Sequence, residues 1–368
     1  MPTVRLTLPQ CVYDIVIEPG VLSRAGERVR AAAPHARAAV VADEAVASTY
    51  GRAVGASLEA SGYDTAQCLM PARETHKTLE TVASLLDTML EHRMERRSPV
   101  VAVGGGITGD VAGYTAASLL RGVPFVQCPT TLLAMVDASV GGKTGVNTRQ
   151  GKNLVGAFHQ PAAVLIDPDT LATLPARELR GGLAECVKHG VIRDADLFDW
   201  ITANVDGILG LDRATLVELV RRNVAIKAAV VQEDEKEQGV RAHLNFGHTF
   251  AHAIEATQDK ADGADPYSHG EAVALGMVAA TRLAVDAGRC DASVYDRLVA
   301  LLERIGLPTS SDRLAADEAL LGVMASDKKV RDGRVRLVLP DAMGAVSVVD
   351  DTPGDAVRSA WASVRVAR

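Results

Sequence analysis

The chain has 368 residues and a formal net charge of −7, with 48% hydrophobic and 23% charged residues. This composition is that of an ordinary globular protein and excludes a disordered, collagen-like or coiled-coil chain. The acidic balance gives no support for a nucleic-acid-binding surface or a basic membrane anchor, so we expect a small-molecule partner and a length sufficient for two or three domains.

The spacing of the cysteines and the character of the apolar segments indicate the cellular compartment of the protein. The 5 cysteines are scattered and form no C-x-x-C pair, which indicates reduced thiols rather than disulfides or a thiolate zinc site. Residues 1–10 alternate polar and apolar side chains and do not have the pattern of a signal or transit peptide. The most apolar stretch, 99–120, contains Asp110 and several glycines, unlike a membrane span. We expect a cytoplasmic protein without membrane or nucleic-acid partners.

The first part of the chain alternates strand and helix patterns. Residues 4–8 and 12–18 have the period-two alternation of a hairpin. Further strands and helices then follow in turn, with strands at 37–42, 66–70 and 100–103 and helices at 45–60 and 77–91. This alternation is typical of a parallel α/β sheet.

The second part is mostly helical. Helical periodicity is present at 177–190, 213–232, 249–256, 270–287 and 292–305. One strand pattern follows, at 334–339, after an Asp-Gly turn signal. We therefore predict an α/β nucleotide-binding domain over residues 1–175 and a mostly α-helical domain over residues 176–368.

A glycine-rich loop follows the strand at 100–103. Gly104, Gly106 and Gly109 match G-x-G-x-x-G, and a helical pattern follows over 111–120. Such glycines let the backbone approach a pyrophosphate at a helix start, although a packing turn explains the same residues. No acidic residue for a ribose stands about 20 residues further on, so Asp43 or Glu44, at the end of an earlier strand, is the better candidate.

A second loop, 137–153, carries two lysines among glycines. It lacks the first glycine of a P-loop, because Asp137 occupies that position. Glycine turns that present ammonium groups and N–H donors suit a phosphate or carboxylate, whereas the alternative is a pair of solvated surface lysines.

Histidines and a carboxylate form a candidate metal site. His248 and His252 lie one helical turn apart, His269 stands at a helix start, and Glu185 lies on a third helix. A catalytic zinc typically takes three such ligands and keeps a position for water or substrate. Spacing alone does not decide whether His248 pairs with His252 or with His269.

From about residue 36 to 345 the chain carries a series of specific motifs: Gly104–Asp110, Leu120–Gly122, Pro129–Leu133, Val136–Asn147, Gly151–Leu154, Gln160–Pro161, Thr173–Pro175, Arg177–Glu178, Ala184–Glu185, Asn245–Glu255, His269–Glu271 and Asp327–Lys329. Together they resemble the 3-dehydroquinate synthase family, sugar-phosphate cyclases of the shikimate pathway. The resemblance implies a lyase that needs NAD and a divalent metal, Zn²⁺ or Co²⁺, and that forms a homodimer.

The resemblance also assigns residues by position. It places the metal ligands on Glu185, His248 and His269, and leaves His252 to contact the substrate phosphate. NAD contacts are implied for Asp43, Glu74, Lys77, Gly105, Gly106, Asp110, Thr130, Thr131, Lys152, Thr170 and Thr173. Substrate contacts are implied for Arg121, Asp137, Lys143, Asn153, Lys188, Lys227, Arg241, Asn245, His252 and one of Lys328 and Lys329. The resemblance implies a catalytic role for Glu237, a candidate proton acceptor, and for Lys143, Lys188, Arg121, Asn245 and His252.

The implied reaction converts 3-deoxy-D-arabino-heptulosonate 7-phosphate to 3-dehydroquinate and phosphate. It proceeds by transient NAD oxidation, phosphate elimination, re-reduction and intramolecular aldol closure. Asn245 and His252 favour the dehydroquinate type over valiolone-forming cyclases, whereas an amino-sugar variant and a polyol dehydrogenase with net NAD turnover remain alternatives. The segment before His269 is a few residues longer than the family pattern.

Overall fold

The computed structural model describes residues 2–258, 266–326 and 336–366. The chain forms two compact units, the first made of Met1–Leu174 and Leu211–Glu235 and the second of Pro175–Gly210 and Lys236–Arg368. These units differ from the expected domains, 1–175 and 176–368, by one helical segment. That segment returns to the first unit because its helix packs against the first strand of the chain, a long-range contact that chain order does not reveal.

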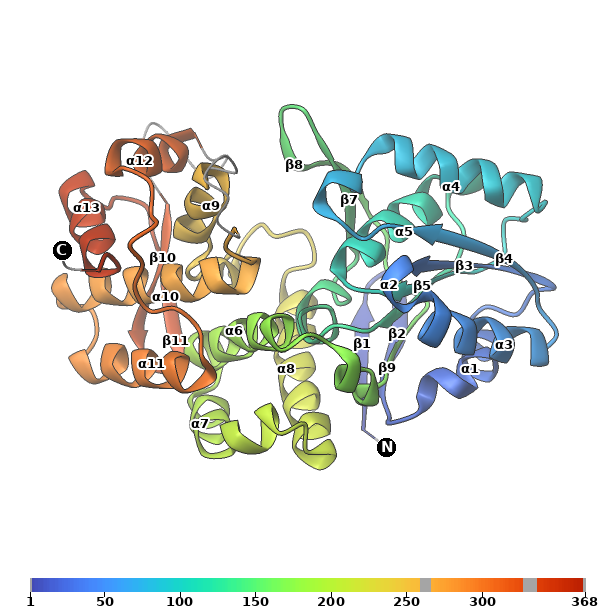
Figure 1. Cartoon of the computed structure of the whole chain (residues 1–368), viewed down its shortest axis with the longest axis horizontal. Helices are drawn as coiled ribbons and strands as arrows, with labels where there is room; N and C mark the ends of the chain where they lie inside the picture. The colour runs from blue at the N-terminus through green and yellow to red at the C-terminus, as the bar shows by residue number, and fades with distance from the viewer. Residues whose placement is uncertain (1, 259–265, 327–335, 367–368) are drawn as a thin grey trace. The chain divides into compact units, whose positions relative to one another are not determined.

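The first unit is built on a seven-stranded sheet in the order β1-β2-β9-β6-β5-β3-β4 (Figure 1). Its strands are β1 (Thr3–Leu8), β2 (Cys11–Ile17), β3 (Arg37–Asp43), β4 (Asp64–Met70), β5 (Val100–Gly104), β6 (Phe125–Pro129) and β9 (Ala163–Ile166). β1 and β2 form the predicted antiparallel hairpin, and the other neighbours in the sheet are parallel. The α/β fold expected from sequence is confirmed.

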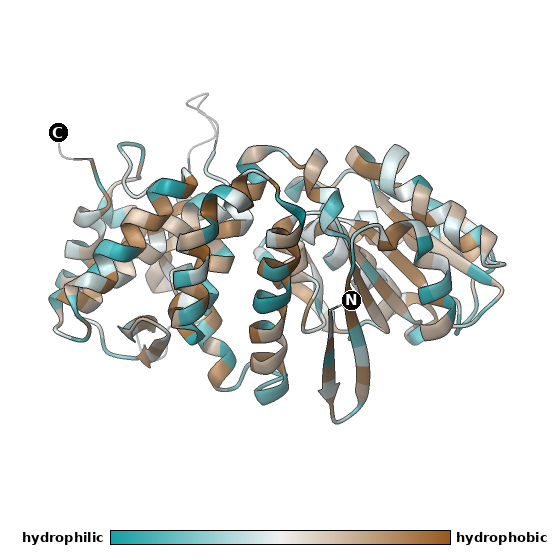
Figure 2. Ribbon diagram, turned by 90° about the horizontal axis from the view of Figure 1, so that it is seen from below, coloured by the Kyte–Doolittle hydropathy of each residue, from teal (hydrophilic) through white to brown (hydrophobic). Residues whose placement is uncertain are grey.

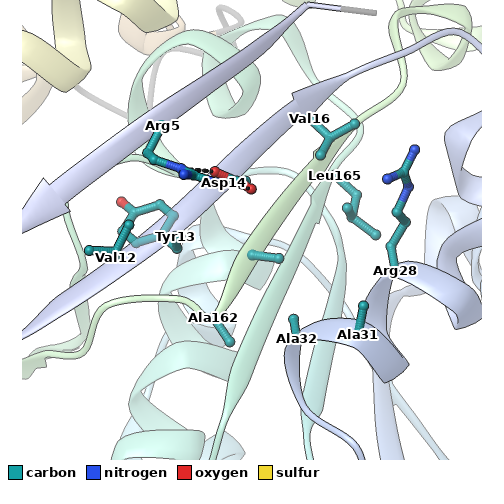
Figure 3. Close-up of a pocket in the computed structure, with 11 residues that line it drawn as sticks. Arg5, Val12, Tyr13, Asp14, Val16, Arg28, Ala31, Ala32, Ala162 and Leu165 are labelled. Atoms are coloured by element: carbon teal, nitrogen blue, oxygen red, sulfur yellow. Dashed lines mark hydrogen bonds and ion pairs between the residues drawn. The ribbon is translucent and has the colours of Figure 1, made fainter.

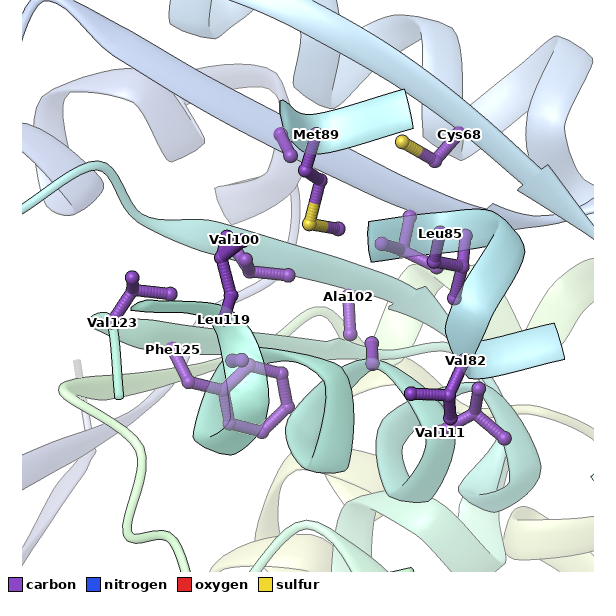
Figure 4. Packing of buried hydrophobic residues seen from close by; sticks show 14 of the residues in the cluster. Cys68, Val82, Leu85, Met89, Val100, Ala102, Val111, Leu119, Val123 and Phe125 are labelled. Carbon is purple, nitrogen blue, oxygen red and sulfur yellow. The ribbon is translucent and has the colours of Figure 1, made fainter. Parts of the chain in front are cut away.

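Helices cover both faces of this sheet. α4 (Leu79–Glu91) and α5 (Gly106–Ser118) lie on one face, and α1 (Ala25–Ala32) and α3 (Arg52–Ala60) lie on the other. The short α2 (Glu44–Val46) follows β3, and α8 (Arg213–Glu233) packs against β1. Val41 and Ala102 face one layer, where they belong to the core that includes α4 and α5 (Figure 4). Val40 and Val101 point the other way, into the core formed with α1 and α3. The central strands β3, β5, β6 and β9 are buried on both faces and are therefore mostly hydrophobic along their length, in keeping with the brown sheet strands of Figure 2.

Three details of the first unit differ from the sequence prediction. The helix expected over 45–60 is interrupted by a wider turn at Ala47–Gly51. The helix α5 already begins at Gly106, so the glycine loop forms its first turn. The lysine-bearing segment predicted as flexible turns is instead a β-hairpin, β7 (Lys143–Thr148) and β8 (Gly151–Phe158), because its Val and Thr residues pair across an antiparallel ladder.

The second unit is helical around α10 (His269–Asp286), which packs against α6, α9, α11, α13 and β10. Its other elements are α6 (Ala176–Arg193), α7 (Ala195–Leu209), α9 (His248–Thr257), α11 (Ala292–Ile305), α12 (Asp317–Ser326), α13 (Gly354–Ser363), β10 (Leu337–Ala342) and β11 (Ala345–Val349). The sequence prediction missed α7, α12, α13 and β11, so the strand near the end is one of an antiparallel pair. The predicted start of that strand at 334 lies outside the described residues.

Glycine contacts bring the backbones of α6, α9 and α10 close together. A Cβ atom added at Gly270 would lie 2.2 Å from the carbonyl oxygen of Gly181, and one added at Gly276 would lie 2.1 Å from that of Gly247. Any side chain at these positions would force the helices apart. The three helices that carry the candidate metal ligands are therefore fixed at distances that only glycine allows.

The cysteines are free, as expected from their spacing. Among the described residues, none of the helices combines the length and the apolar character that crossing a membrane requires.

Candidate metal centre and nucleotide-binding loop

Glu185, His248 and His269 converge in the second unit. Oε1 of Glu185 lies 3.5 Å from Nε2 of His248 and 3.4 Å from Nε2 of His269. The donor atoms of the three residues all lie within 4.8 Å of one another. His252 is outside this group, with its ring centroid 5.8 Å from that of His248. One carboxylate and two imidazoles form a donor set that suits Zn²⁺ or Co²⁺.

The ligands come from defined places in the helices. His248 and His269 are the first residues of α9 and α10, and Glu185 lies in the buried middle of α6. The glycine contacts stand next to these ligands, since Gly247 precedes His248 and Gly270 follows His269. The close approach of the helix backbones thus determines the separation of the ligands.

The second ring nitrogen of each histidine is held by an oxygen. Nδ1 of His248 lies 3.1 Å from the carbonyl oxygen of Phe246, and Nδ1 of His269 lies 3.0 Å from Oε1 of Glu255. An acceptor at Nδ1 places the hydrogen there and leaves the lone pair on Nε2. Both rings therefore present Nε2, the atom that faces Glu185. Glu255 belongs to a motif recognised in the sequence, but only the structure assigns it this contact.

Lys188 lies one turn after Glu185 on α6 and forms an ion pair with its Oε2 atom. The Lys188 side chain is 1% exposed and that of Glu185 is 0% exposed. A buried cation beside a buried carboxylate offsets the cost of burying either charge alone. The other carboxylate oxygen, Oε1, faces the histidines.

The surroundings of the two histidines shift their pKa values in opposite directions. Burial, together with the charge of Lys188, lowers the pKa of His248 well below its ordinary value. Burial acts to lower the pKa of His269 as well, but hydrogen bonds with Glu185 and Glu255 outweigh it and raise the pKa to about 10. Metal binding must displace the proton from His269 because only the neutral ring is a ligand.

Arg177 fixes the start of α10. Its guanidinium donates to both carboxylate oxygens of Glu271, at 2.9 and 2.6 Å, and to the carbonyl oxygen of Pro266 at 2.6 Å. Glu271 in turn accepts from the backbone N–H of Ser268, whose hydroxyl caps the helix. The backbone on both sides of His269 is thereby tied to α6. The sequence analysis gave these residues no role.

Replacing Arg177 by alanine is expected to lower the free energy of unfolding by about 1–3 kcal/mol, because Glu271 loses a bidentate charged donor. Urea unfolding at pH 7 measures this loss. Arg213→Ala is a matched control, since Arg213 also binds a carboxylate, that of Asp169, through two nitrogens but is 69% exposed. Arg213→Ala is expected to lower the free energy of unfolding by less than about 1 kcal/mol. Equal losses in the two variants would argue against a special role of Arg177 in holding the start of α10.

The stabilisation that the Arg177–Glu271 ion pair provides is expected to depend on pH. Burial acts to raise the pKa of Glu271, but the bonds from Arg177 and Ser268 outweigh it and hold the pKa below the ordinary 4.5. The stabilisation is therefore complete above pH 4.5 and is lost as the pH falls through the lowered pKa. The difference in stability between wild type and Arg177→Ala should narrow over that range.

The glycine loop of the first unit lies where the sheet changes direction. From β3 the chain moves outward to β4, then returns to β5 on the other side of β3 and continues to β6 and β9. In open α/β sheets, ligands bind beyond the carboxyl ends of the strands at such a switch point. Asp43 ends β3 and Gly104 ends the neighbouring β5, so the predicted acid and the predicted loop lie at the same edge.

The geometry of the loop fits a phosphate. Gly105 precedes α5 without a side-chain cap, so backbone N–H groups at the helix start are available to a ligand. A Cβ on Gly105 would lie 3.2 Å from Cγ2 of Thr131, and one on Gly104 would lie 2.5 Å from Oγ1 of Thr108. Gly104 is thus required for close packing against Thr108, which agrees with the alternative that the glycines form a packing turn. Gly105 and Gly106 place no side chain in front of the backbone N–H groups at the helix start.

A polar network joins several predicted NAD contacts to the β7–β8 hairpin. Lys77 Nζ binds Asp110 at 2.5 Å and the side-chain oxygen of Asn153 at 2.6 Å. Asn147 donates to Glu74 at 2.7 Å and accepts from the backbone N–H of Asn153. Asn153, which is predicted to contact the substrate, thus also contacts Lys77, which is predicted to bind NAD.

The remaining predicted residues fall in both units. In the first, Lys227 forms an ion pair with Asp137, and Thr173 shares a hydrogen bond with Tyr50 at 3.0 Å. In the second, Asn245 donates to Glu237 at 3.4 Å, and Arg241 is buried. The other members lie in the first unit, with Thr130 and Thr170 buried and with Arg121, Lys143 and Lys152 exposed. Lys328 and Lys329 lie outside the described residues.

One cavity of about 260 Å³ lies elsewhere in the first unit (Figure 3). Its lining comes from β1, β2, α1 and the beginning of β9, with Arg5 and Asp14 paired at 2.8 Å on its wall. It contains none of the predicted site residues and lies near the amino ends of the parallel strands. It is therefore distinct from the glycine loop.

Comparisons with known proteins match this chain to one family over most of its length. The model described as 3-dehydroquinate synthase N-terminal matches residues 67–181, and the one described as 3-dehydroquinate synthase C-terminal matches residues 182–330. The chain is 46% identical over 357 residues to the 3-dehydroquinate synthase of Microcystis aeruginosa, covering 96% of each chain. It is 46% identical over 365 residues to that of Gloeobacter violaceus, covering 99% of this chain and 100% of the relative.

A solved structure shares the architecture. It is the 2-epi-5-epi-valiolone synthase of Streptomyces hygroscopicus subsp. jinggangensis 5008, with NAD⁺ and Zn²⁺ bound. The similarity has a TM-score of 0.88 at 31% identity and covers 97% of this chain and 98% of that chain. On the strength of the family models and the full-length relatives, this chain belongs to the 3-dehydroquinate synthase family.

Proposed function

We propose that this chain converts 3-deoxy-D-arabino-heptulosonate 7-phosphate to 3-dehydroquinate and phosphate, using bound NAD and a divalent ion, as a cytoplasmic homodimer. The observation that carries the proposal is the convergence of Glu185, His248 and His269 in a member of this family that also has a glycine loop at a sheet switch point. When bound, NAD supplies a reversible hydride acceptor and Zn²⁺ or Co²⁺ supplies a Lewis acid.

The residues around the ligands have properties that suit a sugar phosphate. Lys188 places a buried ammonium group beside Glu185 and so offers a donor for a substrate oxygen. His252 lies on the same face of α9 as His248, one turn away, where it can contact the phosphate and move a proton. Arg241 adds a buried guanidinium in the segment before α9. These groups are assigned to substrate binding and catalysis.

Glu237 adopts a left-handed backbone conformation, with φ of 58°. A non-glycine residue in this region costs about 1–2 kcal/mol, and such strain concentrates at functional sites. Its carboxylate accepts a hydrogen bond from Asn245, another residue assigned to the substrate. Both features support Glu237 as a proton acceptor.

In the first unit, the exposed Lys143, Lys152 and Arg121 provide charges for anionic groups, and Asp137 with Lys227 provides a further ion pair. We assign Lys152 to the cofactor together with Asp43, Gly105, Thr130 and Thr131, which lie at the carboxyl edge of the sheet. The remaining charged residues, Lys143, Arg121, Asp137 and Lys227, are assigned to the substrate. This division follows the family pattern and is open to test.

The decisive experiment measures phosphate release from 3-deoxy-D-arabino-heptulosonate 7-phosphate with catalytic NAD, with and without a chelator. Release that needs both NAD and metal, yields dehydroquinate and leaves no NADH supports the proposal. Net NADH from a polyol would instead identify a dehydrogenase. Release only from an amino-sugar analogue, or from another sugar phosphate, would reassign the substrate.

Asp43→Ala is expected to weaken NAD binding about 10–100-fold, because the variant loses a charged acceptor for the ribose hydroxyls. Titration of the protein with NADH, followed by fluorescence, measures the change. Glu44→Ala is the matched control, since Glu44 is the next residue and is exposed. An equal or larger loss in Glu44→Ala would transfer the role to that residue.

A further inference from the structure

The carboxylate of Glu255 stands behind the candidate metal centre, on the opposite side of the His269 ring from Glu185. Oε1 of Glu255 lies 3.0 Å from Nδ1 of His269, while Nε2 of the same ring lies 3.4 Å from Oε1 of Glu185. The imidazole therefore bridges two carboxylates through its two nitrogens. Only one of these carboxylates belongs to the ligand set.

The contact between Glu255 and His269 follows from the position of Glu255 on α9. His248 and Glu255 are seven residues apart on α9, which places them on the same face two turns from each other. One helix thus supplies a ligand and also the group that holds the other ligand. The Glu255 side chain is 12% exposed, so this carboxylate has given up most of its contact with water. A buried carboxylate is costly unless charged donors satisfy it.

The Nδ1 atoms of His248 and His269 have different hydrogen-bond acceptors. His248 donates to a backbone carbonyl, that of Phe246, which is neutral, whereas His269 faces a carboxylate. A carboxylate behind a histidine fixes the tautomer and the ring orientation and makes the metal-binding nitrogen more basic. His269 needs this support more than His248, because its side chain is 34% exposed whereas that of His248 is 12% exposed.

We propose that Glu255 is the positioning residue of this metal centre: it holds the Nδ1 hydrogen of His269 and directs Nε2 toward the ion. The proposal rests on the metal requirement of the proposed function. It assigns Glu255 no contact with ion, cofactor or substrate. Its effect is on how tightly the ion is held and on the ligand field that the ion experiences.

A purely structural role is the alternative, in which the Glu255–His269 contact only ties α9 to α10. The two helices already meet through the contact between Gly247 and Gly276. A structural ion pair would change thermal stability and leave metal affinity as it is. A positioning role changes metal affinity and the spectrum of the bound ion.

The test uses the full-length chain, stripped of metal and titrated with CoCl₂. The dissociation constant comes from competition with a chromophoric chelator, and the ligand field comes from the visible absorption of bound Co²⁺. Glu255→Ala is expected to bind Co²⁺ about 10–100-fold more weakly than wild type and with a changed visible spectrum. Glu255→Gln retains an oxygen that can accept from Nδ1 and is expected to recover part of this affinity.

Asp317→Asn serves as the matched control. Asp317 is a partly buried carboxylate of the same unit, paired with Arg365 at 2.9 Å, and it lies outside the ligand group. Its substitution should lower the melting temperature while leaving the Co²⁺ dissociation constant and spectrum within about twofold of wild type, as expected for an ion pair remote from the site.

The outcomes separate this proposal from the proposed function. Wild-type affinity and spectrum in Glu255→Ala would overturn the role of Glu255 and leave the metal centre standing. Failure of wild type to bind Co²⁺ would overturn the metal centre and this proposal with it. Should Glu255→Ala not fold, Glu255→Gln decides: weaker Co²⁺ binding at an unchanged melting temperature supports the proposal, and unchanged binding rejects it.

Discussion

His248→Ala is expected to lose the bound divalent ion and to reduce turnover about 1000-fold or more. His248 supplies one of the three converging donors, and two remaining ligands rarely retain a catalytic zinc. Loss of a Lewis acid removes several kcal/mol of stabilisation from the transition state, and each 1.36 kcal/mol is a tenfold change in rate. Metal analysis after dialysis and the phosphate-release assay measure the two effects.

A histidine on the same helix provides the comparison. His252→Ala leaves the three ligands in place, so this variant should keep its metal while losing activity through the substrate phosphate. NADH binding should survive in both variants, since the glycine loop belongs to the other unit. A metal-loaded, active His248→Ala protein would refute the ligand assignment, and a metal-free His252→Ala protein would show that His252 is a ligand.

Gly276→Ala is expected to destabilise the second unit by about 1–3 kcal/mol or more and to weaken metal binding, although it adds a single methyl group. The added Cβ would lie 2.1 Å from the carbonyl oxygen of Gly247, a backbone atom that cannot move without displacing the start of α9. His248 is the next residue. Urea unfolding and Co²⁺ titration of the same protein would report the packing and the ligand displacement separately.

Gly322→Ala is the control for the glycine substitution itself. Gly322 lies within α12, and a Cβ added there would meet no atom within 4 Å. This change should stabilise the protein by a few tenths to about 1 kcal/mol, because alanine is the better helix former and restricts the unfolded chain. If the two variants behaved alike, the glycine contact between α9 and α10 would not be what sets the ligand distance.

The sequence predicted the α/β sheet because several central strands, such as β3 and β5, are buried on both faces and form short apolar runs in the sequence. It located the glycine loop for a similar reason, since a strand that ends at glycines and continues as a helix is a local pattern. It missed the β7–β8 hairpin. Glycines, lysines and asparagines in that segment hide the strand signal, and the ladder forms only through pairing between the two strands.

From spacing alone, the candidate metal site was predictable in its residue types but not in which residues belong to it, and the family resemblance supplied the set Glu185, His248 and His269 that the structure brings together. Spacing on one helix offered His248 with His252 as readily as His248 with His269. In the structure, His269 completes the group because the backbone of α10 approaches that of α9 at Gly276 and that of α6 at Gly270. Distances between helices depend on packing, which one-dimensional periodicity does not contain.

The sequence by itself therefore determined many of the elements, the family and the chemical types of the ligands, all of which depend on local pattern and residue identity. The tertiary structure alone decided that α8 packs against β1 of the first unit, that Arg177 clamps the start of α10, and that Glu255 faces His269. The physical reason is the same in each case: these contacts join residues distant in the chain, and only the packed fold brings their side chains within hydrogen-bonding or van der Waals distance.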